Sequence, residues 1–222
     1  MKKHSAIKDL LAVMAKLRAP EGCPWDREQT HRTLRFHAVE EVYELMDAIE
    51  AEDDHEMIEE LGDLLLQVIF HCQLAQERGA FDFEQVARTI TEKLIRRHPH
   101  VFGTVKVKDV AEVWANWEQI KKTEKQGTRH ARASVLDGIP KHLPALMRAE
   151  KLVKKARKGK LLSGEQTGPR QTKSDVAKQL FALADYAQVQ GWSAEELLRA
   201  QVRKNERELR RREQTQAARQ SA

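Results

Sequence analysis

The chain has 222 residues, of which 33% are charged and 5% aromatic, and its formal net charge is +5 with a sequence pI of about 9.2. This length suits one good core or two small ones, and this composition favours amphipathic helices over sheets. No secretory signal is predicted after Met1, and the longest apolar run, residues 64–70, cannot span a bilayer, so we expect an all-α, cytoplasmic protein without a membrane partner.

Helical periodicity describes the first 124 residues. Apolar residues three or four apart predict one helix up to about Arg18 and a second from about Thr33 to Ala51. Capping boxes, in which Asp is followed three residues later by Glu or Gln, predict three further helices. The third helix is apolar nearly all round, so we expect it to be central in a bundle. The capping boxes are Asp53 with Glu56, Asp82 with Gln85, and Asp109 with Glu112.

The second half of the chain reads as a reduced copy of the first. Residues 125–142 are polar and contain Gly and Pro, and a helix is predicted to follow up to Lys158. Residues 159–172 are predicted to be flexible, and two more helices follow, from Ser174 to Gln190 and from Ser193 to about Arg219. We therefore divide the chain into a helical domain, a linker with a connecting helix, and a shortened repeat with a basic helical tail. These divisions are residues 1–124, 125–158 and 159–222.

Acidic residues gather on the two helices that flank Glu52. Residues three or four apart share a helix face, so each helix presents a small acidic cluster. In an antiparallel hairpin centred near Glu52, Glu41 lies level with Asp63 and Glu44 lies level with Glu60. Carboxylates from both helices are therefore predicted to meet across one interface. The acidic residues of the two helices are Glu40, Glu41, Glu44, Glu59, Glu60 and Asp63.

Such a carboxylate cluster predicts a metal site. Like charges packed together are unstable unless they are protonated or neutralised by a cation. Hard oxygen ligands suit Mg²⁺ or Mn²⁺, and Mg²⁺ usually keeps waters that a substrate phosphate can displace. For a single Glu, a solvated helix face is the ordinary alternative, but the matched set favours a metal. A di-iron bundle would need Glu-x-x-His on its helices, and the spacing from Glu52 to His55 falls in the turn.

A cationic counterpart is predicted on the fourth helix, where Lys93 and Arg97 are one turn apart. Phosphate chains bound through a metal need such groups to hold the charge that builds during transfer. A solvated surface role is the alternative for both. Trp25 and Trp117 are candidates for stacking on a nucleotide base, although a Trp at helical spacing also suits a core.

These residues resemble the MazG-type nucleotide pyrophosphohydrolases, within the wider all-α pyrophosphatase superfamily. Residues 40–44 and 60–63 match the Glu-Glu-x-x-Glu and Glu-x-x-Asp signature of that family. The resemblance is close from Ile7 to about Lys158. Three flanking pieces also resemble the family, namely residues 22–26, 96–102 and 117–121.

The resemblance implies hydrolysis of nucleoside triphosphates to the monophosphate and pyrophosphate, as house-cleaning of the nucleotide pool, by a homodimeric helical bundle. It implies that Lys93 and Arg97 grip the phosphates and that Trp117 lies near the nucleotide. Mg²⁺, or Mn²⁺ in its place, would activate a water whose proton Glu40 is a candidate to take. The metal ligands would be Glu41, Glu44, Glu60 and Asp63.

The second half departs from the two-copy members of the family. It has no Glu-Glu-x-x-Glu, and residues 175–178, which end in Lys178, stand in place of Glu-x-x-Asp. We therefore expect no catalytic metal there. The alternative function is a catalytically inactive protein that senses nucleotides, or that holds nucleic acid or a protein partner through its basic C-terminal helix. The intact carboxylates favour the enzyme, so nucleic acid is the less favoured partner.

Overall fold

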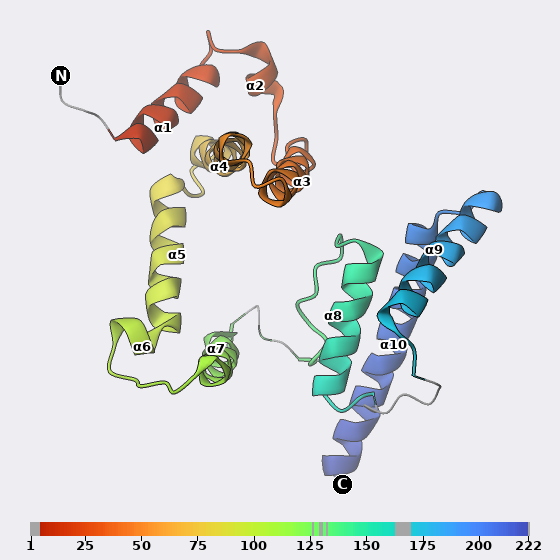
Figure 1. Ribbon diagram of the computed structural model, residues 1–222. Helices are drawn as coiled ribbons and strands as arrows, with labels where there is room; N and C mark the ends of the chain where they lie inside the picture. The colour runs from red at the N-terminus through yellow and green to blue at the C-terminus, as the bar shows by residue number, and fades with distance from the viewer. Residues whose placement is uncertain (1–4, 126, 129–130, 132, 163–169, 222) are drawn as a thin grey trace. The chain divides into compact units, whose positions relative to one another are not determined.

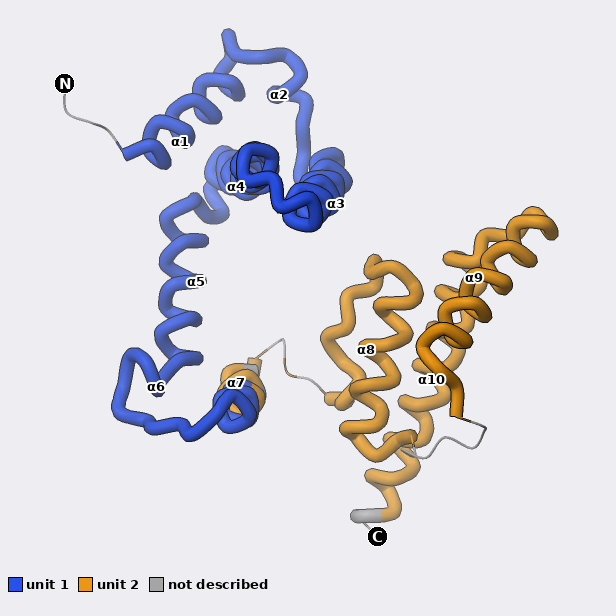
Figure 2. The backbone as a smooth tube through the Cα atoms, in the orientation of Figure 1, with its two compact units in different colours: residues 1–117 blue, residues 118–222 orange. Residues whose placement is uncertain are grey.

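The computed structural model describes residues 5–125, 127–128, 131, 133–162 and 170–221. Throughout these ranges the regular elements are α-helices, without a strand (Figure 1). The all-α prediction is confirmed. The chain forms two compact units, residues 1–117 and 118–222, and the division falls within α7 (Val110–Lys125) (Figure 2). No helix in the described ranges is long and apolar enough to cross a membrane.

In unit 1, the first of the two, α4 is the central helix. The helices α1, α3 and α5 each pack against α4, as its predominantly apolar sequence predicts. Figure 1 shows α3 and α4 side by side, whereas α5 leaves the end of α4 and runs away from this pair. The helices that precede α7 are α1 (Ala6–Leu17), α2 (Pro24–Glu28), α3 (His37–Glu50), α4 (Asp54–Glu77), α5 (Phe83–Arg97) and α6 (Pro99–Phe102).

The predicted helix starts are capped by their aspartates. Asp53 accepts hydrogen bonds from two backbone N–H groups at the start of α4, and Asp82 forms a reciprocal capping box with Gln85 at the start of α5. Asp109 accepts from the backbone N–H of Glu112 at the start of α7. Each cap satisfies N–H groups that lack partners within the helix, which fixes where the helix begins.

A tight turn joins α3 to α4. The Asp53 N–H donates to the Ala48 carbonyl at 3.1 Å and the Glu52 N–H donates to the Ile49 carbonyl at 3.2 Å, the two bonds of a Schellman motif. Glu52 has a φ of 54°, the left-handed conformation that this motif requires. Because Asp53 also caps α4, the chain reverses within two residues, and the predicted hairpin is centred at Glu52.

The core of unit 1 lies between α1, α4 and the segment before α3. Met14, Leu34 and Ile69 are at most 1% exposed, and Phe70 and Leu74 complete the buried cluster. Full burial of a side chain of this kind stabilises the fold by about 1.5–3 kcal/mol. This cluster fixes α1 against α4.

The side chain of Arg18 connects three elements of unit 1. It donates two hydrogen bonds of 2.6 Å to the two carboxylate oxygens of Glu77 at the end of α4, and a third to the Asp26 carbonyl in α2. The guanidinium lowers the pKa of Glu77. The bidentate pair with Glu77 connects the end of α1 to α4, and the bond to Asp26 connects it to α2.

One helix boundary differs from the sequence prediction, and two short helices were not predicted. The second predicted helix was expected from about Thr33, but α3 begins at His37. The Thr33 hydroxyl donates to the Thr30 carbonyl and accepts from the Thr30 N–H, and these local bonds compete with helix formation. The short helices α2 and α6 were not predicted. Each starts at a proline, Pro24 or Pro99, which suits a first helical position because no N–H is needed there.

Unit 2 is built on α8 (Ala145–Lys158) and α10 (Ala194–Ser221), which pack together, with α9 (Lys173–Val189) against α10. These helices confirm the predicted ones to within a few residues. Of the segment predicted to be flexible, residues 163–169 lie outside the described ranges. The interpretation of residues 159–222 as a reduced repeat stays a prediction. The buried core comprises Leu136, Leu152, Ala156, Leu161, Val202 and Leu209.

Candidate functional site

The α3–α4 hairpin brings carboxylates from both helices together. Glu41 of α3 and Glu60 and Asp63 of α4 are half-buried, and one carboxylate oxygen from each lies within 4.8 Å of the other two. Because the hairpin reverses at Glu52, residues at similar distances from this turn lie beside one another. The three residues are called the carboxylate cluster below.

The cluster is electrostatically strained without a cation. Burial raises the pKa of Glu41, and the nearby Asp63 and Glu44 raise it further. Burial also raises the pKa of Glu60, followed by the charges of Glu44 and Asp63. One Glu60 oxygen, Oε2, is buried without a hydrogen-bond partner among the described residues. Clustered carboxylates with an unsatisfied oxygen fit a hard divalent cation such as Mg²⁺ or Mn²⁺.

The other two predicted acidic residues of α3 lie at the edge of this cluster. Glu44 is exposed, but its charge acts on both Glu41 and Glu60, so it stands beside the cluster. Glu40 is also exposed, and its Oε2 lies 3.6 Å from Nδ1 of His37. The structure therefore brings three of the four predicted ligands within 4.8 Å of one another, and the fourth, Glu44, lies next to them. Glu40, the predicted base, is exposed.

One polar residue of the site was not singled out from the sequence. Gln67 is 7% exposed, and its amide Nε2 donates a hydrogen bond of 3.4 Å to Oε1 of Glu41. The signal that could have identified it is the interruption of an apolar run, residues 64–70, by a single amide one helical turn after Asp63.

The predicted phosphate-binding residues belong to a different part of unit 1. Lys93 and Arg97 lie in the last part of α5, which runs away from the hairpin in Figure 1. Next to this end of α5, the ring of His98 lies edge-on to Trp117, with centroids 4.9 Å apart, and Trp117 contacts Trp114 at 5.4 Å. Within one chain, the fold does not bring this group to the carboxylate cluster.

Trp25 is exposed at the surface of unit 1. Its side chain is 54% exposed, and its ring lies edge-on to those of His37 and Phe70 at 6.2 and 6.5 Å. The contact with His37 places the Trp25 ring beside the start of α3, which is the helix that carries Glu41. An exposed indole that is held in place by ring contacts is suited to stacking on another aromatic ring.

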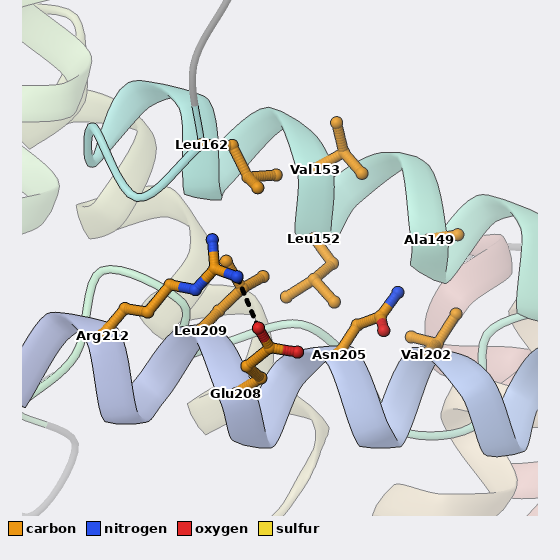
Figure 3. Close-up of a pocket in the computed structure, with 9 residues that line it drawn as sticks. All are labelled: Ala149, Leu152, Val153, Leu162, Val202, Asn205, Glu208, Leu209 and Arg212. Atoms are coloured by element: carbon orange, nitrogen blue, oxygen red, sulfur yellow. Dashed lines mark hydrogen bonds and ion pairs between the residues drawn. The ribbon is translucent and has the colours of Figure 1, made fainter.

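Unit 2 contains a cavity of about 240 Å³ between α8 and α10 (Figure 3). Its lining is mainly apolar, and its charged groups, Glu208 and Arg212, form an ion pair with each other. This lining offers no group of carboxylates for a metal, in contrast to the carboxylate cluster in unit 1. The lining residues are Ala149, Leu152, Val153, Leu162, Val202, Asn205, Glu208, Leu209 and Arg212.

Comparison with known proteins identifies a domain in this part of the chain. Residues 29–102, which include the whole carboxylate cluster, match the model of the MazG nucleotide pyrophosphohydrolase domain. A nucleoside triphosphate pyrophosphohydrolase of Escherichia coli K12 is 51% identical over 150 residues, which cover 67% of this chain and 56% of that protein.

Two further relatives have no function in their names. An uncharacterized 26.1 kDa protein of Streptomyces cacaoi is 42% identical over 194 residues, covering 86% of this chain and 76% of the relative. The uncharacterized protein YabN of Bacillus subtilis is 52% identical over 143 residues, covering 64% of this chain and 29% of the relative. The chain thus spans 56% of the length of the Escherichia coli relative and 29% of that of YabN.

Proposed function

The chain belongs to the MazG family of nucleotide pyrophosphohydrolases, and from this premise we propose that it hydrolyses nucleoside triphosphates between the α and β phosphates. The products would be the nucleoside monophosphate and pyrophosphate. The observation that carries the proposal is the meeting of Glu41, Glu60 and Asp63 within 4.8 Å, inside the matched domain. Removal of unwanted triphosphates from the nucleotide pool is the corresponding cellular role.

Glu41, Glu60 and Asp63, with Glu44 beside them, would hold Mg²⁺ or Mn²⁺. Such an ion neutralises phosphate charge and lowers the pKa of a bound water. The water oxygen would attack the α-phosphorus, and the bond from that phosphorus to the bridging oxygen would break, so that pyrophosphate leaves with the bridging oxygen. Glu40, which is exposed beside Glu41 in α3, is the candidate to accept the proton of the water.

A homodimer is part of the proposal. Helices α3, α4 and α5 expose apolar side chains that a single chain leaves uncovered, and large exposed apolar patches mark interfaces. A second copy would cover them and could bring its own Lys93, Arg97 and Trp117 to the carboxylate cluster, since α5 carries Lys93 and Arg97 away from the hairpin of its own chain and Trp117 lies beyond it in α7. The exposed residues include Val42, Met46, Ile49, Ile58, Leu61, Leu65, Ile90 and Leu94.

The proposal is tested by identifying the products. The purified chain would be incubated with a panel of nucleoside triphosphates and Mg²⁺, and the phosphorus-containing products would be separated. We expect monophosphate and pyrophosphate from at least one nucleotide, with no turnover in excess chelator. Diphosphate and free phosphate as initial products, or full turnover in chelator, would contradict the assignment.

A further inference from the structure

We propose that Gln67 is a positioning residue for the metal site: its side-chain amide holds the Glu41 carboxylate in the orientation in which it faces Glu60 and Asp63. This inference rests on the proposed function, because it gives Gln67 a role toward the metal ion that the carboxylate cluster would bind. It concerns a residue outside the predicted ligand set.

The position of Gln67 on α4 directs it toward α3. Gln67 follows Asp63 by one helical turn and therefore shares its face of the helix. The side chain is buried, at 7% exposure, and its Nε2 lies 3.4 Å from Oε1 of Glu41 across the hairpin. The amide thus reaches the one ligand of the cluster that comes from the opposite helix.

The chemistry of the contact fixes the orientation of the amide. A carboxylate that binds a metal is ionised and only accepts hydrogen bonds, so in the metal-binding form the NH₂ group of Gln67 faces Glu41, as it does in this structure. The amide oxygen Oε1 is then buried without a hydrogen-bond partner among the described residues. A buried acceptor left unpaired destabilises a fold, whereas an apolar side chain of similar length would pack in this apolar stretch of α4 without that cost. Core stability therefore does not explain a glutamine here, and a role toward Glu41 does.

A hydrogen bond to one oxygen restricts rotation of the Glu41 carboxylate. The group is then presented to an ion in one orientation, which lowers the entropy lost when the ion binds. Outer contacts of this type commonly change metal affinity or activity by about 10- to 100-fold when they are removed.

The same helix provides a matched control. Gln73 donates its amide to Oε1 of Glu77 at 3.1 Å, which is the same type of contact. Glu77 is already held by two hydrogen bonds from Arg18 and is not part of the carboxylate cluster. Loss of the Gln73 amide should therefore leave metal binding unaffected.

The test is titration calorimetry of the full chain with Mn²⁺, combined with thermal unfolding and hydrolysis assays, for wild type, Gln67→Met and Gln73→Met. In Gln67→Met we expect the Kd for Mn²⁺ to rise about tenfold or more, and the Mn²⁺ concentration for half-maximal hydrolysis to rise by a similar factor. Its Tm without metal should be unchanged or higher. Gln73→Met should bind Mn²⁺ as the wild type does.

Each contrary result has a distinct meaning. Unchanged Mn²⁺ affinity in a folded Gln67→Met protein overturns the inference and leaves the proposed function standing. Loss of thermal stability in both Gln67→Met and Gln67→Leu assigns the amide to folding and also overturns it. A wild-type chain that binds Mn²⁺ but hydrolyses no triphosphate overturns the proposed function, while weaker Mn²⁺ binding by Gln67→Met still supports the positioning of Glu41. A wild-type chain that binds no Mn²⁺ overturns both.

Discussion

At the scale of single residues, Glu60 is the most constrained member of the carboxylate cluster. One of its oxygens is buried without a partner in the described part of the chain, and four neighbouring carboxylates act on its charge, namely Glu44, Asp63, Glu41 and Glu59. A fold does not gain stability from such an arrangement. The residue is therefore best explained by binding of a cation, and its removal should separate function from stability.

We predict that Glu60→Gln lowers metal-dependent hydrolysis on the order of 100-fold or more, since it removes a charged ligand rather than an outer contact. The free energy of unfolding without metal should stay equal or rise, because the amide carries no charge that burial must desolvate. Steady-state kinetics and urea unfolding measure the two effects. Glu59→Gln, at an exposed neighbouring position, is the control and should keep near-normal turnover. A Glu60→Gln enzyme that is equally active would show that Glu60 is not a ligand.

The same residue predicts a pH dependence. The pKa of Glu60 is raised in the folded chain above its ordinary 4.5, so its contribution to stability is present below that value and is lost as the pH rises through the raised pKa. Without metal, Glu60→Gln should therefore be no more stable than the wild type at low pH. It should become more stable than the wild type as the pH rises through the raised pKa of Glu60. Adding Mn²⁺ at neutral pH should raise the Tm of the wild type more than that of the variant.

At the scale of elements, the α3–α4 hairpin depends on one residue in an unfavourable conformation. Glu52 adopts a φ of 54°, where a Cβ atom is close to the following carbonyl oxygen. The Schellman bonds and the Asp53 cap on either side hold this turn in place. The hairpin therefore forms despite Glu52, and glycine would suit the position better.

We predict that Glu52→Gly stabilises the protein by up to about 1 kcal/mol, because relief of the left-handed strain exceeds the added flexibility of the unfolded chain. Thermal or urea unfolding measures the change, and hydrolysis should be unaffected. Ala51→Gly is the matched control, since Ala51 has a φ of −75° and gains nothing from glycine. Destabilisation by Glu52→Gly would indicate that its side chain makes a contact that outweighs the strain.

At the scale of the whole molecule, the proposed site is divided between two regions of unit 1. The carboxylate cluster lies on the α3–α4 hairpin, whereas Lys93 and Arg97 lie toward the far end of α5. Exposed apolar residues on all three helices favour a second copy as the covering partner. An isologous dimer would form two equivalent sites, each with groups from both chains.

This arrangement predicts complementation between inactive chains. Glu60→Gln and Lys93→Ala should each be nearly inactive alone. Refolded or co-expressed together, they should recover about a quarter of wild-type activity, because half of the dimers are mixed and each mixed dimer holds one intact site. The measurement is specific activity after mixing, with the oligomeric state checked by light scattering. If the mixture stays inactive although mixed dimers form, both groups act within one chain.

The sequence alone determined the longer helices and the carboxylate cluster, because both depend on local signals. The caps at Asp53 and Asp82 mark helix starts, and the reversal at Glu52 sets Glu41 beside Asp63 through helical periodicity. Tertiary structure decided what depends on packing between elements. The hydrogen bonds between Thr30 and Thr33 keep the residues before His37 out of α3. Packing of α4 against α3 brings the Gln67 amide to the Glu41 carboxylate. The direction in which α5 leaves α4, which no local pattern encodes, separates Lys93 and Arg97 from the carboxylates of their own chain.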